Sequence, residues 1–122
     1  MDQDKKTALL DKLELDTITN DSSCIAEIAR FILDAHPHAE AKLVLELITV
    51  KKFPVQGDLH DPQLDKKYLL FYVAHELIFK SLDRGSAEGE DRFAWVRAIG
   101  DNLTQWVASL VLFQGEKDFF RL

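Results

Sequence analysis

The sequence predicts an all-α protein with five to seven helices. The strongest observation is the stretch from Leu64 to Leu82, which is predominantly apolar and contains neither glycine nor proline. A β-strand of that length would be abnormal, so we interpret the stretch as a helix. Apolar residues elsewhere recur at the helical spacing of three and four. No stretch alternates apolar and polar residues in the way a half-buried strand does.

The longest apolar stretch is expected to form the central buried helix, over residues 62–83. Asp61 and Pro62 offer an N-cap and a first helical position, and Gly85 offers a stop. At about 100° per residue, apolar positions cover most of the circumference, which is typical of a helix surrounded by other helices. One mixed strip is left to meet solvent or a ligand, and it contains Asp65, Leu69, Tyr72, Glu76, Lys80 and Asp83.

Three shorter helices are expected before the central one. The first covers residues 5–15, and the second runs from a capping cluster at 20–22 to about Ala35, where His36 and Pro37 end it. The third begins with Pro37 and reaches about Phe53. In the first helix Ala8, Leu9 and Leu13 are expected to point inward, and whether Leu10 does so stays open. The apolar positions at helical spacing are Ile25, Ile28, Ala29, Ile32 and Leu33 in the second helix, and Leu43, Val44, Leu47, Ile48 and Val50 in the third.

One or two helices are expected after the central helix, over residues 92–113. Gly100 could kink this run, since glycine costs about 1 kcal/mol in a helix interior. Gly115 is expected to cap the end, so that 114–122 is a short tail of one domain spanning 1–122. Apolar positions at helical spacing are Phe93, Val96, Ile99, Leu103, Trp106, Val107, Leu110 and Val111.

Composition and charge exclude several classes of function. With 47% hydrophobic and 30% charged residues, the chain has the composition of a soluble globular domain. A net charge of −6 and the absence of a basic cluster argue against nucleic-acid or anionic-membrane binding. A single cysteine, a charged N-terminus and only short apolar runs predict an intracellular domain without a disulfide, a signal peptide or a membrane span.

Residue types that carry chemistry are present but are not arranged for catalysis. His36 and His38 are two apart, so they point in different directions on a helix, and His60 and His75 have no ligand at metal-binding spacing. Cys24 starts the second helix, where a small buried thiol is favoured over a nucleophile. No phosphate-binding loop, nucleophile elbow or zinc-protease motif occurs. We therefore expect no enzyme activity, no metal and no cofactor.

Residues 67–85, KYLLFYVAHELIFKSLDRG, resemble the fourth-helix signature of the RNA polymerase II CTD-interacting domains (CIDs). That signature has a lysine, an apolar run with a tyrosine, Ala-Asn-Asp, two aliphatic residues, Asn-Ser, basic residues and a glycine. Residues 20–33 are similar to the second helix of the family, and the resemblance covers about residues 5–85. Tyr72, Ala74, Ser81 and Gly85 match, while His75, Glu76 and Lys80 replace the three amides or acids of the signature.

The resemblance implies a right-handed helical superhelix, shared with VHS and ENTH domains. In CIDs a CTD heptad peptide lies as a β-turn in a groove formed by the second helix, the fourth helix and a later one. A member of the family acts in transcription or RNA processing in the nucleus, without direct nucleic-acid or membrane contact. The implied peptide-binding residues are Asn20, Asp21, Ser22, Ser23, Leu69, Tyr72, Val73, Glu76 and Lys80, with Lys80 and Arg84 as phosphate contacts.

The implied site is chemically reasonable but departs from the family pattern. A peptide rich in Tyr, Ser and Pro needs an apolar floor, a carboxylate acceptor such as Glu76 and a cationic donor such as Lys80. A plain i, i+4 surface ion pair between these two residues is the competing interpretation. Glu76 is one methylene longer than the family aspartate. Ala108 stands near the position of a phosphate-binding arginine, which weakens the expectation of phosphoserine binding.

Two other functions stay open from the sequence. The chain could be a helical scaffold subunit that docks a protein partner through exposed Phe79, Trp95, Phe119 and Phe120. It could also be a trafficking adaptor of the VHS or ENTH type in the cytoplasm, although its acidic first helix lacks the basic character that ENTH membrane binding requires. Binding of a phosphopeptide should weaken with salt, whereas apolar docking should not.

Overall fold

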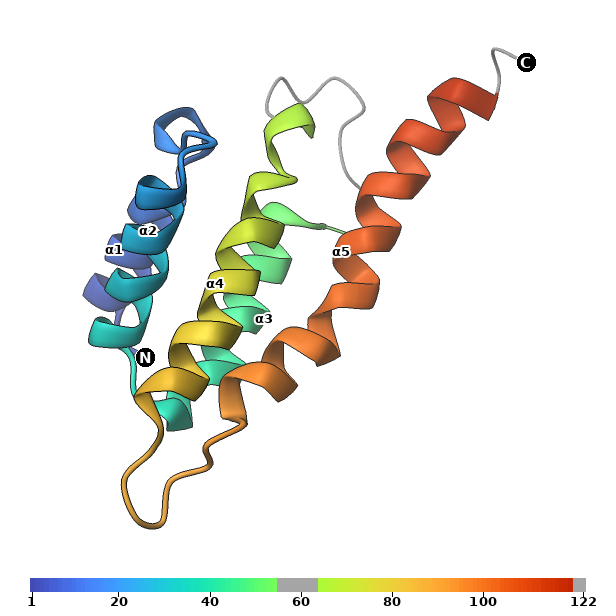
Figure 1. The fold of residues 1–122 in the computed structure, drawn as a ribbon. Coiled ribbons are helices and arrows are strands. Elements are labelled where there is room, and N and C mark those ends of the chain that lie inside the picture. Colours follow the sequence, from blue (N-terminus) through green and yellow to red (C-terminus); the bar gives the residue numbers. More distant parts are fainter. Residues whose placement is uncertain (55–63, 120–122) are drawn as a thin grey trace.

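The computed structural model describes residues 1–54 and 64–119, and within these ranges every regular element is a helix (Figure 1). The side chains of Leu64 and of residues 111–119 lie outside this description. The all-α class is confirmed, whereas the right-handed superhelical path stays a prediction. The α-helices are α1 (Gln3–Lys12), α2 (Ser22–Ala35), α3 (Ala41–Lys52), α4 (Leu69–Arg84) and α5 (Ala94–Phe119); short 3₁₀ turns occupy Leu15–Thr17, His38–Glu40 and Leu64–Lys66.

The helices pack chiefly in two pairs, α2 with α4 and α3 with α5. Figure 1 shows α1 and α2 on one side of α4, with α3 behind it and α5 on the other side. An ion pair of 2.8 Å between Arg84 and Asp34 joins the C-terminal ends of α4 and α2. The two helices therefore run in the same direction, and their N-terminal ends lie at the same end of the pair (Figure 1).

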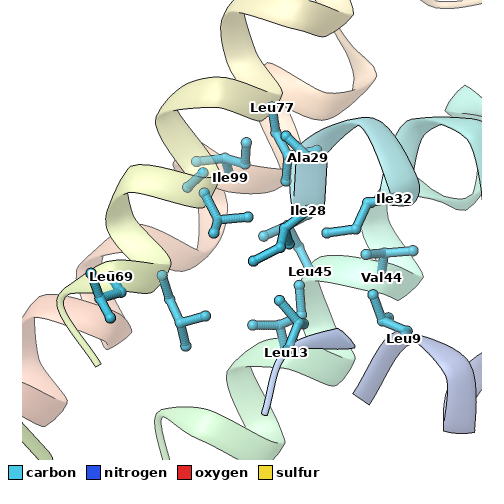
Figure 2. Close-up of a cluster of buried hydrophobic side chains, with 14 of the residues drawn as sticks. Leu9, Leu13, Ile28, Ala29, Ile32, Val44, Leu45, Leu69, Leu77 and Ile99 are labelled. Carbon is cyan, nitrogen blue, oxygen red and sulfur yellow. The ribbon is translucent and has the colours of Figure 1, made fainter. Parts of the chain in front are cut away.

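One apolar core holds all five helices together. Figure 2 shows side chains from α1, α2, α3, α4 and α5 converging on a common centre. Burying one such aliphatic side chain contributes about 1.5–3 kcal/mol, so this cluster is the main source of stability. Members labelled in Figure 2 are Leu9, Leu13, Ile28, Ala29, Ile32, Val44, Leu45, Leu69, Leu77 and Ile99.

The first helix begins and ends earlier than the sequence predicts, and the second agrees with its prediction. Asp2 caps α1 by accepting a hydrogen bond of 2.8 Å from the Lys5 backbone N–H, and α1 ends at Lys12. Ala8 is exposed, so its expected place in the core is wrong, and Leu10 is half-buried. α2 starts after Asp21 and ends before His36, as expected from its cap and its proline stop.

The third helix starts later than expected, and only part of its apolar surface is buried. Pro37 precedes a 3₁₀ turn rather than opening the helix, and α3 itself begins at Ala41. Of its apolar positions, Leu43 and Val50 are exposed, while Val44, Leu45 and Ile48 lie in the core. The helix carries apolar residues on more than one face, and packing, chiefly against α5, decides which of them are buried.

The central helix differs from its prediction at the start and in its surroundings. α4 begins at Leu69, not at residue 62, after a 3₁₀ turn and the non-capping Tyr68. The expected N-cap at 61–62 lies outside the described residues. Tyr72 is 50% exposed, as expected for the mixed strip, but the expected burial of the remaining circumference is wrong, because Tyr68 and Phe79 are exposed by 45% and 59%. α4 is therefore buried on one side and open on the other.

The last helix is one continuous element, and neither glycine interrupts it. α5 continues as a helix through Gly100 and runs on through Gly115 to Phe119, so the short tail at 114–122 is wrong for residues 114–119. A single glycine costs about 1 kcal/mol, which burial of Ile99 and Trp106 on either side outweighs. Trp95 is fully buried, so the expectation that it is an exposed docking residue is also wrong.

A polar network inside the α3–α5 interface fixes the register of these two helices. The Thr49 hydroxyl accepts a hydrogen bond of 2.7 Å from Trp106 Nε1 and lies 2.8 Å from Asn102 Oδ1. Gln105 Nε2 donates to the Phe53 carbonyl at 2.8 Å, and the Phe53 ring stacks on Trp106 at a centroid distance of 4.5 Å. Because each of these groups needs its partner, a slip along the helix would leave buried polar atoms unpaired.

A second polar cluster ties α1 to the turn after α2. His36 is buried and its Nδ1 lies 2.8 Å from Glu40 Oε1, while Lys5 Nζ lies 3.4 Å from Glu40 Oε2. The hydrogen bond with His36 lowers the pKa of Glu40 below its ordinary value of 4.5, and the Lys5 charge acts in the same direction. A carboxylate whose pKa is lowered by folding stabilises the folded state when it is ionised.

We expect Glu40→Gln to reduce stability at neutral pH and to have a smaller effect in acid. The Glu40 contribution is fully present above its ordinary pKa of 4.5 and is lost as pH falls through the lower pKa of the folded state. Denaturant unfolding of the wild type and the variant between pH 7 and pH 3 measures this. Glu46→Gln, which removes an exposed carboxylate from α3, is the control. A pH-independent difference would contradict the assignment.

Candidate functional site

The side of α4 that faces away from the core carries the strongest candidate for a binding site. Tyr72 is half-exposed, and Glu76 and Lys80 follow it at one and two helical turns. A shallow hollow of about 490 Å³ opens beside Glu76 and Lys80, and its other lining residues are Phe79, Leu82 and Asp83. The structure therefore brings together the three residues on which both the helical periodicity and the family resemblance agree.

The charged pair in this site has the geometry of an ordinary helix-surface ion pair. Lys80 Nζ lies 3.8 Å from Glu76 Oε2, and each side chain is about one third exposed, at 29% and 34%. Such exposed pairs contribute only about 0.3–0.5 kcal/mol to stability. The pair is therefore weak enough to open for a ligand, and its two groups offer an acceptor and a donor side by side.

Leu69 and Val73, predicted as the apolar floor of the site, lie in the core. Each is only 3% exposed, because these two positions of α4 turn toward the packed interior. The prediction that Leu69 and Val73 lie on the binding surface is therefore wrong, and they support Tyr72 from beneath. The exposed rings of α4 provide apolar contact area instead: Phe79 lines the hollow, and Tyr72 lies one helical turn before Glu76.

The residues predicted from the second helix form its N-terminal cap. Asp21 Oδ1 accepts hydrogen bonds of 3.0 Å from both the backbone N–H and the hydroxyl of Ser23. These bonds, the backbone one first, lower the pKa of Asp21 below its ordinary value of 3.8. Asn20 and Ser22 are exposed beside the cap. All four lie at the N-terminal end of α2, which is at the same end of the helix pair as the start of α4 (Figure 1).

Both predicted phosphate contacts already face carboxylates. Lys80 pairs with Glu76, and Arg84 forms a 2.8 Å ion pair with Asp34 that holds α4 to α2. Ala108 is exposed on α5, and no basic residue occurs between Arg97 and Gln114. A phosphate at this site would have to displace a carboxylate from Lys80 or Arg84, which favours an unphosphorylated ligand.

An aromatic stripe on α4 was not recognised as a surface from the sequence. The Tyr68 and Tyr72 rings meet edge to face at 6.0 Å, and the His75 and Phe79 rings lie 4.7 Å apart. These four residues, the aromatic stripe, follow one another at spacings of 4, 3 and 4 along the helix. That spacing was available in the sequence, but aromatic residues at helical spacing are more often core, and only packing shows which face is covered.

A second hollow, of about 440 Å³, lies where the N-terminal part of α5 meets the start of α3. Its charged groups are largely used within the fold: Arg97 pairs with Asp91, and His38 Nε2 lies 3.2 Å from the Gly85 carbonyl oxygen. Lys42 and Asp101 at its rim are exposed and bring opposite charges. This arrangement favours no particular ligand, so the α4 surface is the better candidate.

Within residues 1–54 and 64–119, no three metal-ligating side chains of the His, Cys, Asp or Glu type come together. His36 is engaged by Glu40, Cys24 is half-buried at the start of α2, and His60 lies outside the described residues. None of the helices in the described part of the chain has the length and apolar character needed to cross a membrane.

Comparison of the chain with protein-family models, with curated proteins and with solved structures finds no match. The fold and the site together define an all-helical domain with an open, aromatic and charged face on α4.

Proposed function

We propose that this chain is a non-catalytic peptide-binding module whose ligand lies along α4 beside α2. The observation that carries the proposal is the grouping of half-exposed Tyr72 with Glu76 and Lys80 along one face of α4, where the last two residues line a hollow of about 490 Å³. A tyrosine ring gives contact area at low entropic cost, and the ion pair supplies one acceptor and one donor for a peptide backbone or hydroxyl group.

The family resemblance selects the first ligand to test, the heptad repeats of the RNA polymerase II C-terminal domain. It also supports a superhelical arrangement of the helices and a role in transcription or RNA processing in the nucleus, with other protein subunits as partners and no direct contact with nucleic acid or membrane. Because Lys80 and Arg84 already face carboxylates, the ligand of this chain is an unphosphorylated peptide. A phosphate dianion would also meet Asp83 at the rim of the hollow.

The test is a titration of the 122-residue chain with two-heptad CTD peptides, unmodified and serine-phosphorylated, at low and physiological salt. We expect saturable micromolar binding of the unmodified peptide and weaker binding of the phosphorylated one. Tyr72→Ala and Glu76→Ala should each weaken binding at least tenfold, about 1.4 kcal/mol, because each removes a direct contact.

The matched control is His75→Ala, which truncates another exposed ring on α4 outside the proposed peptide contacts. It should bind the peptide like the wild type, and all three variants should melt cooperatively at similar temperatures. Absence of binding to any peptide form would refute the proposal. Unfolding of both Tyr72→Ala and Glu76→Ala would show that the strip is structural.

A further inference from the structure

We draw no further inference here: the strongest candidate, the exposed aromatic stripe of α4 with the shallow hollow beside Phe79, carries nothing beyond the proposed function because nothing in the structure shows what covers that face.

Discussion

Replacing Leu77 with alanine is expected to lower the free energy of unfolding by about 2–5 kcal/mol. Leu77 is 1% exposed and lies in the part of the core where α4 meets α2 and α5 (Figure 2). The substitution removes apolar burial and leaves a cavity that the surrounding helices fill only partly. Leu70, also 1% exposed, should behave in the same way. Urea unfolding monitored by circular dichroism at several wavelengths measures the change and tests for a single transition.

The matched control on the same helix is Phe79→Ala. Phe79 is 59% exposed, so its truncation removes little buried surface and should change the free energy of unfolding by only about 0.5 kcal/mol or less. Because leucine is the smaller side chain, a larger loss of stability for Leu77→Ala than for Phe79→Ala would show that burial, and not side-chain size, determines the cost. A cost near zero for Leu77→Ala, or a large cost for Phe79→Ala, would mean that α4 turns a different face toward the core.

The helices that the sequence predicts best are those whose ends are set by residues close by in the chain. α2 agrees with expectation because Asp21 supplies a cap and His36-Pro37 a stop, both of which act within a few residues. α5 runs longer than expected because a glycine in a helix carries only a small penalty. At Gly100 the long-range contacts of Trp95, Ile99 and Trp106 outweigh that penalty, and no local pattern contains this information.

The candidate site shows the same division between local and long-range information. Periodicity correctly placed Tyr72, Glu76 and Lys80 near the surface, because the polar pair marks a solvent-facing strip. Periodicity also placed Leu69 on the solvent-facing strip, although that residue is buried. It assigned Phe79 to the apolar part of the helix, although that residue is exposed. The angular position at which α2 and α5 meet α4 decides these cases. That position follows from the shapes of three helices together, which one sequence does not reveal.

Trp106 is the second position at which a large effect is expected, because it combines apolar packing with a hydrogen bond. Its ring stacks on Phe53 at 4.5 Å and meets Phe71 edge to face at 5.5 Å, so it joins α5 to α4 and to the end of α3. Its Nε1 donates to the Thr49 hydroxyl at 2.7 Å. Trp95 is equally buried, but its Nε1 has no hydrogen-bond acceptor among the described residues.

Trp106→Ala should cost about 3–5 kcal/mol in the free energy of unfolding, measured by urea denaturation. Trp106→Phe keeps an aromatic ring but leaves the Thr49 hydroxyl without its donor. Trp95→Phe makes the same change in volume and removes an N–H group that has no partner among the described residues. We therefore expect Trp106→Phe to be the more costly of the two by about 0.5–1.5 kcal/mol, the net value of one buried hydrogen bond. Equal costs would show that the hydrogen bond between Trp106 and Thr49 does not stabilise the α3–α5 interface.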